Sequence, residues 1–295
     1  NGVLDAGEDK DGDGEITRYI LPEPPQTPVT KVISEKNAID IYWSDNSEFS
    51  IDPITQEADF AGFKLYMSSI GSDVVAEDDL LESFNLISQW DIIGDSLFFE
   101  TGLESIRLDA PVYFDGDTSA YWYHYRIDGL QSGWQYNVGL SAFDQGNPDA
   151  ELESLESSLL ANNFRVFCGT PPGEGQQPYA YPDPYYLGAS WEGASTFEED
   201  RKMVFANLPA ECIIRIYSPA GDLVDVIEHD GDYNGDDIRW FNTYSDTEST
   251  VFSGGEHAWD ILTISQQILA RGLYVFSVED LQTGRIEKGT FTIIK

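Results

Sequence analysis

Short apolar and aromatic segments alternate with turn residues along the whole chain, and this pattern predicts strands rather than helices. In the first half, apolar and polar residues alternate with a period of two over 39–43, and aromatic-rich segments at 60–68, 121–127, 136–142 and 163–166 carry the same signal. Gly, Pro, Asn and Asp separate these segments. We therefore expect an antiparallel β-sandwich in this half of the chain.

The second half shows a similar pattern. Expected strands cover 201–206, 212–217, 222–228, 237–241, 272–279 and 289–294. Turn sequences such as Ala220-Gly221-Asp222, Asn234-Gly235-Asp236 and Thr283-Gly284-Arg285 lie between them. The predicted fold class is all-β, with two antiparallel, immunoglobulin-like β-sandwich domains in tandem.

Two segments depart from this pattern. Within 73–93, the residues Leu80, Leu81, Phe84, Leu86 and Ile87 predict a short amphipathic helix in an insertion at about 70–118. Proline-rich residues 22–28 predict a stiff linker. The expected division is an acidic segment with its linker at 1–27, a first domain at 28–168, a linker at 169–190 and a second domain at 191–295.

Residues 28–168 resemble a fibronectin type III domain. Trp43 occupies the place of the tryptophan on the second strand of that family. Leu130 and Tyr136 fit the corner at which a tyrosine hydroxyl returns to upstream backbone. The resemblance implies a sandwich with a surface insertion.

Residues 178–295 resemble the C-terminal sorting domain of the type IX secretion system of Bacteroidetes. The matching motifs are Tyr181-Pro182-Asp183-Pro184-Tyr185, the segments 203–209 and 212–224, Gly272-Leu273-Tyr274, and 288–295. Asp183 replaces the usual asparagine of that family. The resemblance implies secretion to the cell surface or beyond, with the secretion machinery as a partner. The family commonly loses this domain by cleavage, whereas a chain that keeps it would use it as a permanent structural module.

Charge narrows the possible partners. The 295 residues include 53 acidic and 16 basic side chains, for a formal net charge of −37. Nucleic acid is not an expected partner, because phosphate contacts need a basic face. Either the acidic surface suits a salty, extracellular setting, or it binds divalent cations, and the two readings are compatible. No apolar run is long enough for a membrane span, so none is expected.

An acidic motif near the N-terminus predicts a calcium site. Carboxylates at positions 1, 3 and 5 of a loop converge on one hard cation, and a glycine at position 6 permits the turn. The predicted ligands are Asp9, Asp11, Asp13, Glu15 and Thr17. Ile20 stands where an EF-hand has a bidentate glutamate, so the loop resembles dockerin or thrombospondin-type calcium repeats instead.

Residues 1–8 read as the second half of a preceding calcium loop, with Asp5 and Glu8 as its late ligands. We therefore expect the biological chain to begin upstream of Asn1, and the acidic residues 1–20 are not a signal peptide. A second acidic stretch follows in 44–59. Its carboxylates either line a solvated loop or hold another cation, and they are Asp45, Glu48, Asp52, Glu57 and Asp59.

The cysteines Cys168 and Cys212 leave two alternatives open. An exported protein favours a disulfide between them, which would link the two domains. Otherwise Cys212 is a small buried apolar residue and Cys168 is an unpaired thiol.

No catalytic motif stands out, and the sequence predicts no enzyme. His124 is expected to pack in an aromatic strand, His229 to lie in an acidic loop, and His257 to lie beside Trp259. The nucleophile elbow, the P-loop and paired zinc-binding histidines are all missing from the sequence.

The predicted function is a structural or adhesive protein, secreted or held at the cell surface, that associates with itself, in filaments, or with cell-surface components. One alternative is a set of accessory and sorting modules belonging to a larger secreted hydrolase. The other is a carbohydrate-binding module. Its candidate stacking residues would be Trp134, Trp191, Tyr185 and Tyr186.

Overall fold

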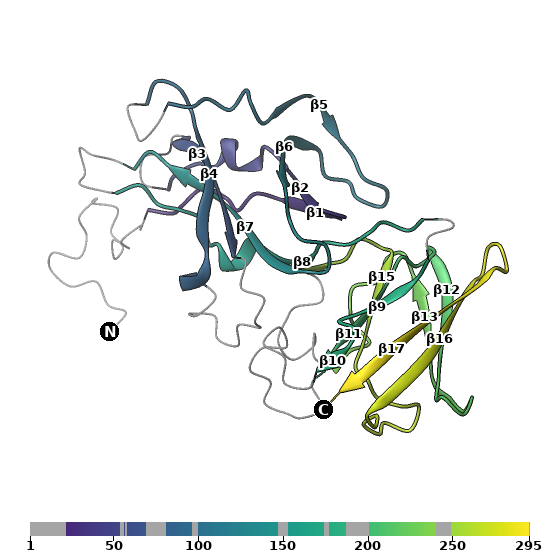
Figure 1. Cartoon of the computed structure of the whole chain (residues 1–295). Coiled ribbons are helices and arrows are strands. Elements are labelled where there is room, and N and C mark those ends of the chain that lie inside the picture. Colours follow the sequence, from purple (N-terminus) through teal and green to yellow (C-terminus); the bar gives the residue numbers. More distant parts are fainter. Residues whose placement is uncertain are drawn as a thin grey trace, which may run out of the picture.

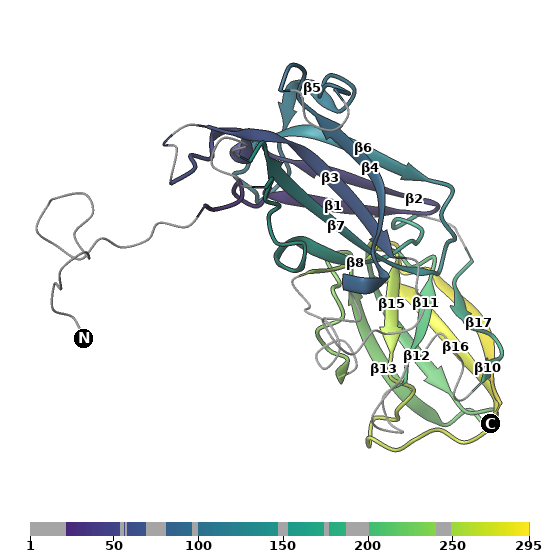
Figure 2. The ribbon, with the colours of Figure 1, turned by 90° about the vertical axis from the view of Figure 1, so that its left-hand side faces the viewer.

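Two β-sandwiches follow one another along the chain (Figures 1 and 2). The computed structural model describes residues 22–53, 56, 58–68, 81–95, 100–146, 153–173, 177–186, 201–239 and 249–294. These residues form four sheets, and helical structure is confined to a few short turns among them. The prediction of an all-β fold with tandem sandwiches is confirmed.

The first sandwich has the strand order of a fibronectin-like domain. One sheet has the order β1-β2-β6-β5, from β1 (Thr30–Glu35), β2 (Ala38–Trp43), β6 (Tyr121–Asp128) and β5 (Arg107–Val112). The other has the order β14-β8-β7-β3-β4, from β14 (Thr250–Val251), β8 (Asn163–Phe167), β7 (Gln135–Asp144), β3 (Phe60–Ser68) and β4 (Asn85–Asp91). Two 3₁₀ turns, η1 (Asn46–Phe49) and η3 (Leu160–Asn162), connect strands.

The alternation that predicted β2 also builds the core of this sandwich. Ile39, Ile41 and Trp43 are fully buried, because every second residue of a strand faces the same side. Trp43 stacks on Tyr123 with ring centroids 5.5 Å apart and meets the edge of Phe63 at 5.6 Å. The tryptophan of the second strand is thus the centre of the first core.

The predicted tyrosine corner is confirmed. The backbone N–H of Gln131 donates to the Tyr136 hydroxyl at 2.9 Å, and Leu130 beside it is buried. This bond ties the start of β7 to the loop that precedes it.

The amphipathic helix expected in 73–93 is wrong for the described part of that segment. Residues 81–83 are helical, but Leu86 and Ile87 lie on β4, which pairs with β3. A Cβ atom at Gly62 of β3 would lie 2.1 Å from the carbonyl oxygen of Trp90, so glycine permits this close approach. Pairing with an existing sheet edge therefore overrides the helical spacing of the apolar residues.

The second sandwich also has two sheets. The small sheet has the order β15-β11-β9, from β15 (Glu256–Trp259), β11 (Met203–Ala206) and β9 (Tyr179–Tyr181). The large sheet has the order β10-β17-β16-β12-β13, from β10 (Tyr185–Tyr186), β17 (Ile286–Ile294), β16 (Gly272–Asp280), β12 (Glu211–Tyr217) and β13 (Leu223–Asp230). Phe205, Phe276 and Phe291 fill the core between them.

Two expectations for this half need correction. The expected linker 169–190 contains β9 and β10, which belong to the second sandwich. Asp183, between these strands, accepts a hydrogen bond from the backbone N–H of Thr292 at 2.9 Å, which fixes the segment to β17. The strand expected over 237–241 is absent from its described residues 237–239, where residue 237 lies in a turn and residue 239 is helical. The described strand that follows β13 and pairs with β11 is β15.

Candidate functional site

The two sandwiches are joined by a strand pairing and by a cluster of packed side chains. Strand β14 of the second sandwich pairs in parallel with β8 of the first, with Thr250 opposite Arg165 and Val251 opposite Val166. The second sandwich therefore adds a short strand to the edge of a sheet in the first, which is a known way of covering unpaired strand backbone.

Aromatic and aliphatic side chains from both sandwiches meet beside this pairing. Phe167 stacks on Phe252 with ring centroids 4.7 Å apart and planes within 5° of parallel. We call this set the junction cluster. Its buried members are Phe167, Val204, Ile238, Phe252 and Ala258, with Tyr181 and Tyr233 packed against them.

The small sheet is buried on both faces. In β11, Met203 and Phe205 belong to the core of the second sandwich, whereas Val204 belongs to the junction cluster. This explains why four successive residues, Met203–Ala206, are all buried. Phe167 of the first sandwich, together with Ile238 and Phe252, thus covers the outer face of β11.

The chain segment that connects the sandwiches is held against β15. A Cβ atom at Gly169 would lie 2.0 Å from the carboxyl carbon of Glu256, and one at Gly255 would lie 2.2 Å from the carbonyl oxygen of Thr170. The Ser253 hydroxyl donates to that same carbonyl oxygen at 3.0 Å. Glycines on both sides permit backbone contact that any other residue would prevent.

Glu256 is the buried acid at this contact. Its side chain is 1% exposed, and Oε1 accepts a hydrogen bond from the Tyr181 hydroxyl at 3.1 Å. Its other oxygen, Oε2, is buried and has no hydrogen-bond partner among the described residues. Burial raises the pKa of Glu256 to about 7, while the bond from Tyr181 acts in the opposite direction.

A buried lysine lies at the same junction. The Lys202 ammonium donates to Gln135 Oε1 in the first sandwich at 3.4 Å and lies 5.7 Å from the ring centroid of Phe167. The contact with Phe167 has cation–π geometry. Polar contacts therefore accompany the apolar ones across the junction.

Two histidines form a second buried cluster beside the junction. His229 on β13 and His257 on β15 approach with Nδ1 atoms 3.2 Å apart. His229 Nε2 lies 3.1 Å from the carbonyl oxygen of Gly254, so Nε2 carries the hydrogen and Nδ1 accepts from His257. His257 Nε2 lies 3.0 Å from Asp237 Oδ2.

The surroundings of this pair are apolar and aromatic. Burial lowers the pKa of His229 to about 4, and the charge of His257 adds to the effect. Tyr233 stacks on His257 with ring centroids 3.8 Å apart. The expectation that His229 lies in a loop is wrong, since it is a buried strand residue. His124 packs on Tyr42 and lies 2.7 Å from Asp40.

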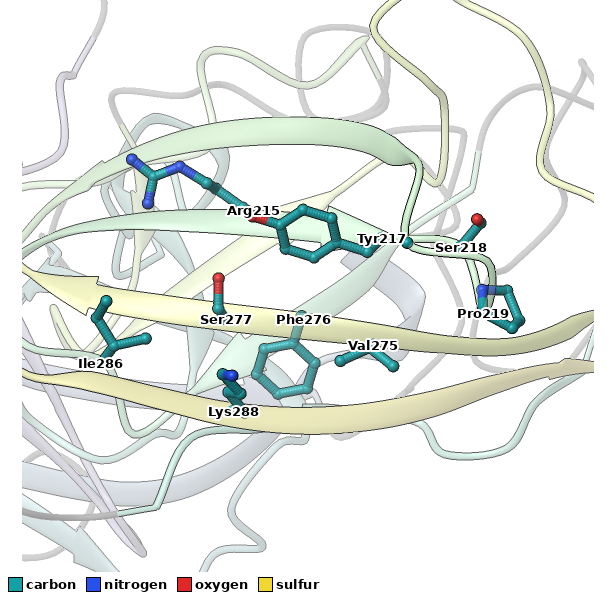
Figure 3. A pocket seen from close by; sticks show the side chains of 10 residues that line it. Arg215, Tyr217, Ser218, Pro219, Val275, Phe276, Ser277, Ile286 and Lys288 are labelled. Carbon is teal, nitrogen blue, oxygen red and sulfur yellow. The ribbon is translucent and has the colours of Figure 1, made fainter.

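The large sheet carries a groove of about 510 Å³ on its outer face (Figure 3). Strand register explains it: Arg215, Ser277 and Lys288 form one row across β12, β16 and β17. Tyr217 and Val275 form the next row. We call this feature the outer groove. Its ten lining residues also include Ser218, Pro219, Gly221, Phe276 and Ile286.

The outer groove combines apolar walls with two cations in a strongly acidic protein. Arg215 pairs with Glu279 at 2.6 Å, and Lys288 is exposed. Ile286 is 54% exposed at its rim. Tyrosine and arginine, both present in this groove, are enriched in protein–protein interfaces.

The predicted calcium ligands lie outside the described residues. These are Asp5, Glu8, Asp9, Asp11, Asp13, Glu15 and Thr17, and Glu57 of the second acidic stretch also lies outside. Over the described ranges of the chain, no three His, Cys, Asp or Glu side chains are placed to hold a metal ion.

The remaining carboxylates of 44–59 have separate roles. Glu48 accepts hydrogen bonds from Tyr123 at 2.5 Å and from Arg107 at 3.2 Å. Burial raises the pKa of Asp59 to about 6, helped by the charges of Asp144 and Asp52.

The predicted disulfide is corrected by the structure. Cys168 and Cys212 are unpaired and buried, and they belong to the cores of different sandwiches. Burial raises the pKa of both thiols to about 12. Both cysteines serve as small apolar residues.

The candidate sugar-stacking residues do not form one described platform. Tyr185 is fully buried in the second core. Tyr186 is 53% exposed and Trp134 is 37% exposed, and Trp191 lies outside the described residues.

Sequence reasoning missed Glu256, Lys202 and the pairing of His229 with His257. The glycine pair Gly254-Gly255 before Glu256 was the available signal, since adjacent glycines indicate close backbone approach. Nothing local marks Lys202 as buried.

Comparisons with known proteins give remote likenesses. No protein-family model matches the chain, and no curated protein matches it. The chain is similar to PorZ, a surface component of the type-IX secretion system of Porphyromonas gingivalis, at 12% identity and a TM-score of 0.28, over 90% of this chain and 23% of PorZ. It is also similar to a two-domain fibronectin type-III segment of chicken tenascin, at 11% identity and a TM-score of 0.25, over 92% of this chain and 99% of the segment.

A third similarity is to dimeric latent PorU of P. gingivalis, at 12% identity and a TM-score of 0.22, over 92% of this chain and 20% of PorU. The chain thus spans less than a quarter of PorZ or PorU. Scores this low carry no argument about function, and the fold assignment rests on the strand order itself. Across the described segments, no helix has the length and apolar character that a membrane crossing requires.

Both cysteines should react with thiol reagents much more slowly in the folded protein than in denaturant, because each thiol is fully buried and protonated. Without a reductant, brief exposure to a thiol reagent should add nothing to the native protein and two adducts per chain in denaturant, as read by intact mass. A denatured chain with no adducts would reinstate the disulfide.

Proposed function

We propose that the chain is a non-enzymatic structural or adhesive protein, secreted or held at the cell surface after type IX-like export, and that it keeps its second sandwich as a permanent part. The sorting-type motifs support the export route. The burial of β11 on both faces supports permanence, because Phe167 of the first sandwich belongs to the cluster that buries its outer face.

Loss of the second sandwich would damage the first. It would expose Phe167 and leave the β8 edge without its β14 partner. Exposed apolar side chains beside an open strand edge favour aggregation. A domain that serves only as a cleavable export signal has no need for such an interface.

The outer groove is the surface that we propose for contact with other copies or with cell-surface components. It lies on the sheet face away from the core and offers apolar side chains, an aromatic ring and two cations. Acidic segments of neighbouring copies complement those cations, and the chain carries a net charge of −37 to supply them.

Calcium is proposed as a cofactor of the N-terminal segment. The spacing of Asp9, Asp11 and Asp13 supports this, since these carboxylates occupy the ligand positions of a calcium loop.

Phe252→Ala should destabilise both sandwiches together. Removing a ring that stacks on Phe167 should lower the free energy of unfolding by about 3 kcal/mol. Phe49→Ala, at a ring that is 69% exposed, is the control and should change little. Urea unfolding followed by fluorescence should show one transition that shifts as a whole. Two separate transitions, with the first sandwich unaffected, would contradict a permanent coupling.

Ile286→Asp should weaken self-association about tenfold, equal to about 1.4 kcal/mol, because it places a charge in the apolar rim of the outer groove. Ile264→Asp is the matched control, since Ile264 is 58% exposed and does not line the groove. Sedimentation velocity with calcium, together with electron micrographs, gives the measurement. Monomers alone at high concentration would count against assembly.

Calcium titration of the full chain in a calorimeter should show binding that Asp11→Asn with Asp13→Asn abolishes, because the hard cation loses two charged ligands. Asp109→Asn with Asp115→Asn, at two exposed acids, is the control for net charge. Equal heats of binding from the unmodified chain and the double variant would mean that calcium binds elsewhere in the chain.

A further inference from the structure

Glu256 lies where three parts of the junction meet. Its carboxyl contacts Gly169 in the connecting segment and Tyr181 on β9, and its own strand β15 pairs with β11 at the junction cluster. The groups facing it are Tyr179 and Tyr181 from β9 and Cys168 at the end of β8. No cation among the described residues pairs with it.

The geometry points to a pH-responsive coupling: protonated Glu256 lets the connecting segment and β9 close on β15, and ionised Glu256 loosens this contact. An isolated buried carboxylate is costly because its hydration is lost and one hydrogen bond cannot replace it. A neutral carboxyl in the same place lacks that cost.

The direction follows from proton linkage. Burial raises the pKa of Glu256 to about 7 from an ordinary value of 4.5, so the closed junction holds its proton over a range in which the opened form has lost it. Opening therefore becomes more favourable as the pH rises from 4.5, and the effect levels off above about 7.

His229, in the neighbouring cluster, acts in the opposite direction. Its pKa is lowered to about 4, so its neutral form loses stability as the pH falls through the range from 6.5 to 4. The pH response of the unmodified protein therefore combines the effects of Glu256 and His229. Comparing the unmodified protein with a Glu256 variant at the same pH isolates the effect of Glu256.

The two buried cysteines supply a built-in readout. Cys168 lies at the junction next to Glu256, whereas Cys212 lies in the core of the second sandwich. The labelling rate of Cys168 relative to Cys212, with dithiodipyridine as the probe, reports opening of the junction in the full chain.

We expect Glu256→Gln to remove the response. At each pH, the ratio of the Cys168 labelling rate to the Cys212 labelling rate is measured in the unmodified protein and divided by the same ratio in Glu256→Gln. This quotient should rise roughly tenfold to a hundredfold between pH 5 and pH 8. Glu228→Gln, at an exposed position on β13, removes the same charge and should behave like the unmodified protein.

A second variant keeps the test decisive if Glu256→Gln folds poorly. Tyr181→Phe removes the hydrogen bond that favours the carboxylate, so opening at pH 8 should increase further. Two results would overturn the proposal: the same pH response in Glu256→Gln and the unmodified protein, or no increase in Tyr181→Phe.

Discussion

Burial of one small sheet on both faces is the constraint on which the rest of the structure depends. Strand β11 contributes Phe205 to the second core and Val204 to the junction cluster, so it is shared by both halves of the molecule. The stacked rings of Phe167 and Phe252 and the pairing of β14 with β8 follow from this arrangement. The two sandwiches have separate sheets, but a shared cluster of buried side chains packs them together.

The sequence predicts those strands whose pattern of apolar residues reflects packing within a single sandwich. Strands β2, β3, β6, β7, β12, β16 and β17 were expected near their observed bounds, since each has six to ten residues and a buried row of apolar side chains. Strands β4, β14 and β15 were not expected. Strand β14 has two residues and exists only where β8 offers an edge, which no local pattern can indicate.

The polar residues of the junction were hard to foresee for a related reason. With 53 acidic residues, carboxylates are common, and only the fold distinguishes buried Glu256 from its exposed counterparts. The tyrosine corner at Tyr136 was predictable because both partners lie in one short stretch of the chain. Gln135 and Lys202, by contrast, meet from opposite sandwiches.

The connection between the sandwiches also has a mechanical consequence. A covalent link alone, such as residues 169–173, would act as a hinge under sideways force. Here the link is packed against β15, and a strand pair and a ring stack span the same boundary. A chain held at one end in moving liquid would therefore resist bending at the boundary between its sandwiches, and a force on one sandwich would pass to the other through this packed boundary.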